Sequence, residues 1–290
     1  MPQETDNHPL MVSIRCITYN HEPYIRQCLD GFVMQKTNFR FEAIVHDDAS
    51  TDGTADIIRE YAEKYPEIIK PIYETENQYS KHDGSINRIM TEACKGKYTA
   101  ICEGDDYWTD PLKLQIQVDF MESHPDYSMC WHRAVTVSAI DEKIKKDYRR
   151  YPKNTTCKVE EMIENGGEFC PTASLLYRKS LKDEAPEELF DQYVGDYPLQ
   201  LYMAFVGKIY YFDREMSSYR ADVPGSWSER NHKDKDYKLV RNKLWFYEKK
   251  LLDDFNRFSY YKYNKNFKQR ENFYLFRAFW ATKEYSIARH

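Results

Sequence analysis

Short apolar runs alternate with amphipathic segments through the first part of the chain. The runs are rich in β-branched and aromatic residues, which predicts strands. These strands are expected at residues 10–18, 41–46, 68–73 and 98–102. Between them, apolar residues recur at helical spacing. The helices are expected at residues 24–33, 57–62 and 83–94. This alternation predicts an α/β fold with a mostly parallel sheet flanked by helices on both faces.

The pattern continues beyond Pro111 with mixed elements and ends in helices. A charged segment at residues 141–158 predicts a loop. The other elements are expected as helices at residues 112–123, 159–165 and 197–205, and as strands at residues 127–139, 172–178, 208–212 and 216–220. From residue 231 onward the periodicity is helical, so we expect a C-terminal helical extension.

The composition narrows the class of protein. A formal net charge of −5 argues against nucleic acid as the main partner. The sequence shows no secretory segment and no long apolar run, so we expect a soluble, cytoplasmic protein. The seven cysteines include no Cys-x-x-Cys pair, which predicts buried thiols rather than disulfides or a zinc site.

The strand at residues 98–102 ends in a cluster of carboxylates. Glu103, Asp105 and Asp106 follow it directly. Two unit charges about 5 Å apart repel by ~3 kcal/mol at an effective dielectric of about 20, so the cluster favours a compensating cation. Mg²⁺ and Mn²⁺ prefer such oxygen ligands. The alternative is an Asp-rich turn that caps the helix beginning near Pro111.

Polar residues follow two other predicted strands in the same way. Thr18, Tyr19 and Asn20 end the first strand, and Asp47 and Asp48 end the second. In parallel α/β sheets, ligands bind beyond the carboxyl ends of the strands. Because three polar clusters are expected at one sheet edge, the pattern favours a binding site there over three separate turns.

Three motifs match a known family in both order and spacing. They are Ile-Thr-Tyr-Asn-His-Glu-Pro-Tyr-Ile at residues 17–25, His-Asp-Asp-Ala-Ser-Thr-Asp-Gly-Thr at 46–54, and Gly-Lys-Tyr at 96–98 leading into Glu-Gly-Asp-Asp at 103–106. Over residues 11–135 the chain resembles the family 2 glycosyltransferases of the GT-A fold, and the similarity weakens afterward.

The resemblance implies an inverting transfer of a sugar from a UDP- or GDP-linked donor, usually with Mn²⁺ or Mg²⁺. The acceptor would be a hydroxyl of a glycan or lipid-linked molecule, as in bacterial surface polysaccharide synthesis. It also implies a division of the chain. Residues 1–10 would be a disordered tail, 11–110 the nucleotide-sugar-binding half, 111–225 the acceptor-binding half and 226–290 a helical segment.

The resemblance assigns donor-binding roles to residues at the first two strand ends. Asp48 would accept the N–H of the donor's base, since a carboxylate only accepts hydrogen bonds. Thr18, Tyr19 and Asn20 would line the base and ribose pocket. Glu22 would reach the ribose or hold the loop. The alternative for Asp48 is turn chemistry, and for Asn20 and Glu22 it is capping of the first helix.

The resemblance assigns binding of the diphosphate and of the metal to residues further along the chain. Asp105 and Asp106 would bind the metal, and Asp105 would also contact the nucleotide-sugar. Glu103 stands where the family usually has an aspartate. Lys81 would lie near the diphosphate or simply in solvent. Arg220 resembles part of a loop that relatives fold over the diphosphate, although the histidine that often follows it is absent here.

Asp196 resembles the family's catalytic base at the start of the acceptor-side helix. One carboxylate must deprotonate the attacking hydroxyl in such a transfer. The alternative is ordinary N-capping, because Pro198 follows closely. Asp191 is the next candidate for the base.

Residues 255–290 combine aromatic side chains with eight Lys and Arg against two Glu. This mixture suits a peripheral contact with the inner face of a membrane. A helical lid packed on the main domain and a homodimer contact have the same signature.

Three other functions fit parts of the pattern. A nucleotidyltransferase would need a Gly-rich phosphate loop after the first strand, where Tyr19 to Glu22 stand instead. A receiver domain would be shorter and would carry its acids after the first strand. The third function is that of a non-catalytic nucleotide-sugar- or carbohydrate-binding protein of the same fold. Only Asp196 argues against it.

Overall fold

One mixed sheet forms the centre of the protein. The structure is a computed structural model that describes residues 8–81, 83–190, 195–224, 226 and 237–287. Its strands are β1 (Leu10–Thr18), β2 (Arg40–Asp47), β3 (Ile69–Tyr73), β4 (Tyr98–Ile101), β5 (Tyr107–Trp108), β6 (Tyr127–Ser138), β7 (Ile144–Asp147), β8 (Thr155–Thr156), β9 (Leu176–Arg178) and β10 (Lys208–Ala221). The order across the sheet is β3-β2-β1-β4-β9-β6-β10-β5, with β7 paired to β6 and β8 to β10.

The first four strands in chain order pair with one another in parallel. β1 pairs in parallel with β2 and β4, and β2 pairs in parallel with β3. β9 is antiparallel to both β4 and β6, and β6 is parallel to β10. The predicted α/β class, with a mostly parallel sheet flanked by helices, is confirmed.

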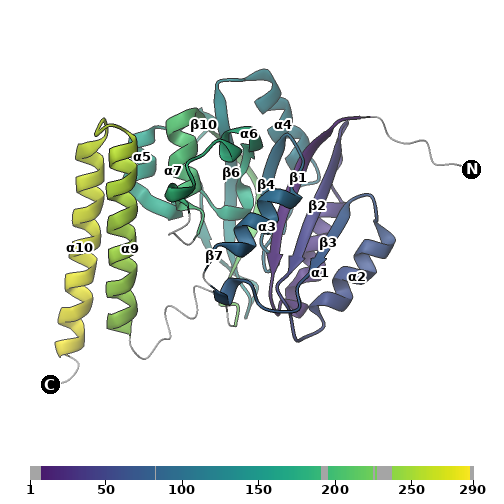
Figure 1. Ribbon diagram of the computed structural model, residues 1–290, viewed down its shortest axis with the longest axis horizontal. Coiled ribbons are helices and arrows are strands. Elements are labelled where there is room, and N and C mark those ends of the chain that lie inside the picture. The colour runs from purple at the N-terminus through teal and green to yellow at the C-terminus, as the bar shows by residue number, and fades with distance from the viewer. Residues whose placement is uncertain (1–7, 82, 191–194, 225, 227–236, 288–290) are drawn as a thin grey trace, which may run out of the picture.

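Helices cover both faces of this sheet. They are α1 (Glu22–Val33), α2 (Thr54–Lys64), α3 (Ser85–Ala93), α4 (Lys113–Ser123), α5 (Val159–Asn165), α6 (Lys179–Asp183), α7 (Tyr197–Val206), α9 (Tyr237–Phe258) and α10 (Asn264–Ile287). Single 3-10 turns are η1 (Tyr79–Lys81), η2 (Gly166–Glu168), η3 (Thr172–Ser174) and η4 (Glu187–Leu189). Figure 1 shows α9 and α10 side by side, at the end of the molecule opposite β3 and α2.

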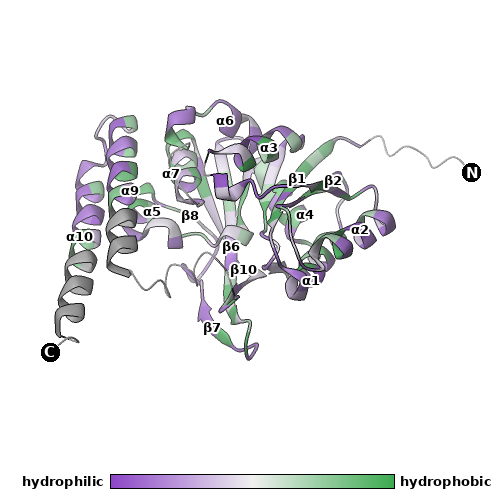
Figure 2. Ribbon diagram, turned by 60° about the horizontal axis from the view of Figure 1, so that its bottom comes forward, coloured by the Kyte–Doolittle hydropathy of each residue, from purple (hydrophilic) through white to green (hydrophobic). Residues whose placement is uncertain are grey.

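Successive side chains of a strand pack into two different apolar clusters, one on each face of the sheet. Cys130 in β6 belongs to a cluster with apolar residues of α1, α2 and α4, whereas its neighbours Met129 and Trp131 pack with α5, α7, α9 and α10. Side chains of successive strand residues point to opposite faces. Figure 2 shows hydrophobic and hydrophilic residues alternating along the helices, as expected where one face of a helix packs on the sheet.

The C-terminal hairpin is anchored in the second of these clusters. Leu252 and Phe255 of α9 and Phe267 of α10 are fully buried. Phe205 of α7 packs against both phenylalanine rings. The turn between the two helices is exposed, and Tyr260 there is 92% accessible. No helix in the described part of the chain is both long and apolar enough to cross a membrane.

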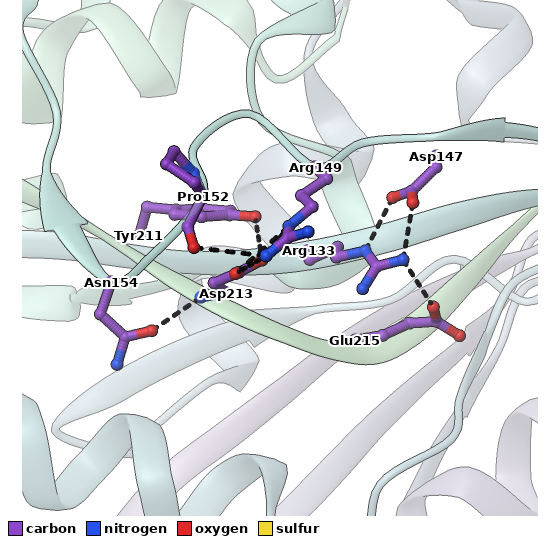
Figure 3. Close-up of polar contacts among 8 residues, drawn as sticks. All are labelled: Arg133, Asp147, Arg149, Pro152, Asn154, Tyr211, Asp213 and Glu215. Carbon is purple, nitrogen blue, oxygen red and sulfur yellow. Dashed lines mark hydrogen bonds and ion pairs between the residues drawn. The ribbon is translucent and has the colours of Figure 1, made fainter.

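The segment at residues 141–158, expected as a loop, contains the short strands β7 and β8. Ion pairs hold it to the sheet (Figure 3). Arg133 of β6 bonds both oxygens of Asp147, at 2.8 and 2.6 Å, and Arg149 bonds Asp213 of β10 at 2.9 Å. The prediction failed because the stabilising partners of these charged residues lie in distant strands. A run of charged residues lacks the alternation of apolar and polar residues that predicts a strand.

Three other boundaries differ from the expectation. Residues 208–212 and 216–220 belong to one long strand, β10, whose pairing with β6 shifts register between Phe212 and Ser217. Residues 172–174 form η3, so β9 begins only at Leu176. β5 was not predicted, because two residues show no periodicity.

Gly96 lies where the chain enters β4, in close contact with the backbone of β1. A Cβ at this position would lie 2.4 Å from the Ser13 nitrogen and 2.6 Å from the Val12 carbonyl carbon. The Gly96 N–H also donates to the Ser13 hydroxyl at 2.8 Å. Only glycine allows β1 and β4 to pair this closely.

We therefore expect Gly96→Ala to lower the free energy of unfolding by about 1–3 kcal/mol, the usual range for overpacking a core. Urea denaturation would measure it. Lys95→Ala is the matched control: it changes an exposed side chain in the same turn, so stability should stay within about 0.5 kcal/mol. Equal stability of the two variants would contradict the contact.

Candidate active site

The loops after β1, β2 and β4 meet at one edge of the sheet, as the sequence predicts. The Asp48 N–H donates to the Thr18 carbonyl at 3.0 Å. The Gly104 N–H donates to the Ile17 carbonyl at 2.9 Å. These bonds continue the strand pairing past the strand ends, so polar residues from all three loops lie side by side.

Gly104 brings the carboxylate loop against the end of β1. A Cβ on Gly104 would lie 2.6 Å from the Thr18 hydroxyl and 3.0 Å from Nδ1 of His21. Both of these polar atoms are buried, and neither has a hydrogen-bond partner among the residues that the structure describes. Burial lowers the pKa of His21, and the nearby Asp105 carboxylate opposes this. Burial therefore favours the neutral form of the ring next to the loop.

Asn20 and Glu22 join the loop after β1 to the loop after β2. Asn20 has a φ of 54°, and its side-chain oxygen accepts the Thr51 N–H at 2.8 Å. The Glu22 carboxylate accepts the Gly53 N–H at 2.8 Å. Both residues thus hold the loops together, and their predicted contacts with a nucleotide stay predictions. Tyr19 is 41% exposed beside them.

Asp48 is buried beneath the segment that follows β3. Its two carboxylate oxygens accept the N–H groups of Gln78 at 2.6 Å and of Tyr79 at 3.0 Å. Only 1% of the residue is exposed. Lys81 ends η1 in the same segment, and its ammonium lies 3.3 Å from Glu76. The predicted roles of Asp48 and Lys81 in binding a donor remain predictions.

The three carboxylates after β4 occupy different environments. Glu103 accepts the Ile17 N–H at 3.3 Å, and desolvation raises its pKa to about 7 although Arg15 lies 3.5 Å away. Asp105 is partly exposed, with one oxygen 3.9 Å from Nε2 of His21. Asp106 is buried and accepts the Arg220 N–H at 2.9 Å. Burial and then the charge of Asp105 raise the pKa of Asp106 well above its usual range.

These environments indicate which residue could hold a metal ion. Among the described residues, no group of three His, Cys, Asp or Glu side chains is arranged to hold one. Mg²⁺ is commonly held by one or two carboxylates together with substrate phosphates. Asp105 fits that role because its carboxylate reaches solvent. Asp106 fits less directly, since one of its oxygens is occupied by the Arg220 N–H.

Arg220 holds the loop of Asp105 and Asp106 in place through hydrogen bonds and ring contacts. Its guanidinium lies between the rings of Tyr24 and Tyr107, 5.1 and 4.5 Å from their centroids. It donates to the Asp105 carbonyl and to the Gln27 side chain. Arg220 belongs to β10 and is 8% exposed. The expectation that it lies in a loop closing over the diphosphate is therefore wrong for this residue, because strand pairing holds it in place.

Asp196 precedes α7, at the N-cap position, but its side chain makes no capping bond. Its backbone there is helical, with φ −96° and ψ −9°, rather than the extended conformation typical of a capping side chain. One carboxylate oxygen instead accepts the Thr172 hydroxyl at 2.5 Å. The alternative of side-chain capping is thus wrong. Asp191 lies outside the described residues.

The charge of Asp196 acts on Glu103, one of the carboxylates after β4. Burial raises the pKa of Asp196 to about 6. Its charge contributes to the raised pKa of Glu103. A carboxylate with a pKa near 6 is ionised at neutral pH and can still accept a proton, as a general base must.

The chain belongs to glycosyl transferase family 2, whose sequence profile matches residues 13–184. An uncharacterized protein of Mycobacterium tuberculosis is 38% identical over 219 residues, which cover 74% of this chain. This chain spans 60% of the length of that relative. An Escherichia coli protein named UDP-Glc:alpha-D-GlcNAc-diphosphoundecaprenol beta-1,3-glucosyltransferase is 33% identical over 113 residues, or 39% of this chain and 42% of the relative.

Solved structures show that the fold is that of the GT-A glycosyltransferases. Residues 1–349 of S. aureus TarS, in complex with UDP-GlcNAc, match with a TM-score of 0.58 at 17% identity. The match covers 82% of this chain and 66% of TarS. A Pyrobaculum calidifontis mannosyltransferase in complex with GDP-Man and Mn²⁺ gives 0.53 at 16% identity, with coverage of 87% and 65%.

The packing of Arg220 leads to a stability prediction. Arg220→Met should lower the free energy of unfolding by about 1–3 kcal/mol, because buried groups lose their hydrogen-bond donor. Amides of residues 103–107 should also exchange faster with deuterium. Arg149→Met is the control, since it removes an exposed ion pair worth about 0–1 kcal/mol. The assignment would fail if residues 103–107 exchanged at the same rate in both variants.

Proposed function

We propose that this protein is an inverting glycosyltransferase that moves a sugar from a UDP- or GDP-linked donor to a hydroxyl group. The observation that supports it most directly is the position of Asp196. In a member of this family, a carboxylate with a raised pKa stands close enough to Glu103 for its charge to act on that residue.

The proton and bond changes can be assigned to residues of this chain. Asp196 takes the proton of the acceptor hydroxyl while its oxygen bonds to the anomeric carbon. The bond between that carbon and the diphosphate breaks, and its electron pair leaves with the diphosphate. Asp105, with Asp106 behind it, would hold Mn²⁺ or Mg²⁺, which neutralises charge on the leaving diphosphate when bound.

The donor would lie along the edge made by the three loops. Thr18, Tyr19 and Asn20 stand at the first loop, and the exposed tyrosine ring is available to pack on a base. Asp48 and Lys81 come from the neighbouring segments. TarS was solved in complex with UDP-GlcNAc and the mannosyltransferase in complex with GDP-Man, which supports a nucleotide diphosphate-sugar donor for this chain.

A glycan or lipid-linked acceptor is the second part of the proposal. The name of the Escherichia coli relative describes transfer to a sugar on diphosphoundecaprenol. That relative supports a role in bacterial surface polysaccharide synthesis on the cytoplasmic side of the membrane. Residues 255–290 would then supply either a peripheral membrane contact or a homodimer contact.

Substitutions at the aspartate pair would test the metal role. Asp105→Asn should reduce Mn²⁺-dependent binding of UDP or GDP at least about tenfold, because an amide is a poor ligand for a hard cation. Asp106→Asn should have a smaller effect, since an amide oxygen can still accept the Arg220 N–H. Calorimetric titration with nucleotide, with and without Mn²⁺, measures both. Unchanged Mn²⁺-dependent affinity in Asp105→Asn would refute the role.

Asp196→Asn should lower transfer by about 10²-fold or more, the usual effect of losing a general base. Wild-type transfer should fall about tenfold per pH unit below about pH 6, since protonated Asp196 cannot accept a proton. The variant should not show this fall at low pH, the acid limb of the profile. It should remain folded, because the Asp196 side chain makes no capping bond. A product assay across pH 5–8 gives the result. Wild-type transfer by a folded Asp196→Asn protein would favour the non-catalytic binding protein.

A further inference from the structure

The turn η3 carries the residue that bonds to Asp196. The Thr172 hydroxyl donates to one carboxylate oxygen of Asp196, Oδ2, at 2.5 Å. Thr172 comes from the segment before β9, whereas Asp196 precedes α7. A hydroxyl has one hydrogen to donate, and at this distance it is committed to the carboxylate.

Buried hydrogen bonds from two other elements hold the turn itself. The indole N–H of Trp108 in β5 donates to the Ala173 carbonyl at 2.9 Å. The side-chain amide of Gln117 in α4 donates to the Ser174 carbonyl at 3.0 Å. The Ser174 hydroxyl closes the turn by donating to the Pro171 carbonyl at 2.6 Å. Thr172 is therefore presented by the core of the protein.

Three groups lower the pKa of Asp196 against the effect of burial, and the Thr172 hydroxyl has the largest effect, ahead of the Asp196 backbone N–H and the Gln200 side chain. The amide of Gln200, on the helix that Asp196 begins, is shared with the carbonyls of Gly167 at 3.3 Å and Cys170 at 3.1 Å. Glu103 faces Asp196 as a second acid. Burial raises the pKa of the Cys170 thiol well above its usual range, so it adds no charge.

We propose that Thr172 is a positioning residue for the general base: its hydroxyl fixes the Asp196 carboxylate so that Oδ1 faces the acceptor. This inference rests on the proposed function. The bond does two things. It selects one rotamer of a short side chain, and it stabilises the ionised form, which can take a proton. Burial acts in the opposite direction, so the hydroxyl partly offsets the effect of desolvation on the pKa of Asp196.

The test compares pH profiles of transfer for variants of Thr172. Thr172→Val keeps the shape and removes the donor. This substitution should raise the pKa of Asp196, so the fall of transfer at low pH (the acid limb of the profile) should begin about one pH unit higher. A pKa change of one unit corresponds to ~1.4 kcal/mol. Below the limb, kcat should therefore be about tenfold lower than in the wild type. The KM for the donor should not change, since the hydroxyl donates its hydrogen bond to Asp196. Thr172→Ser restores a hydroxyl and should return the limb to its wild-type position.

Ser174→Ala is the matched control, because it removes a hydroxyl from the same turn without removing the bond to Asp196. Its acid limb should stay where the wild-type limb lies. If Thr172→Val does not fold, Thr172→Ala removes the same donor and should give the same shift. A variant without the hydroxyl whose limb coincides with that of the wild type would overturn the inference. So would an equal shift in Ser174→Ala, which would indicate loss of the turn alone.

Asp196→Asn separates this inference from the proposed function. If Asp196→Asn loses transfer while Thr172→Val keeps the wild-type profile, Asp196 is the base and Thr172 does not position it. If Asp196→Asn transfers sugar as the wild type does, the proposed base is wrong and the role of Thr172 falls with it.

Discussion

The partial removal of several carboxylates from water is the constraint on which the rest of this site depends. Glu103, Asp106 and Asp196 all have raised pKa values, and burial is the largest cause in each case. Such a cluster persists only where other groups offset the loss of hydration. Arg220 and Arg15 supply positive charge, and backbone N–H groups supply hydrogen bonds. Perturbed acids gathered at one sheet edge are typical of functional sites.

The sheet topology delivers these compensating groups from distant parts of the chain. β10 runs parallel to β6 and also pairs with β5, so Arg220 reaches the loop at Asp106. Trp108 of β5 in turn fixes the turn that carries Thr172. The second half of the chain therefore takes part in building this site. It holds the acids of the first half in position, within one continuous sheet.

Local patterns predicted the parallel strands and the meeting of Thr18, Asp48 and Asp105, because neighbouring parallel strands end at the same edge. They gave no sign of Thr172, and the resemblance that named Arg220 did not reveal its contact with Asp106. The contacts of these residues with the acids span 114 and 24 positions in the sequence, and no periodicity encodes such pairings. The capping interpretation of Asp196 failed for a similar reason, since it weighed only neighbours along the chain.

The contacts of Asp48 have a consequence for ligand affinity. A ligand that bonds to this carboxylate must share it with, or displace, the N–H groups of Gln78 and Tyr79. If it displaces them, binding is coupled to a conformational equilibrium of the segment after β3. The apparent dissociation constant then equals the intrinsic one divided by the fraction of molecules in the open state. Residues that touch no ligand can thus set affinity, through the population of that state.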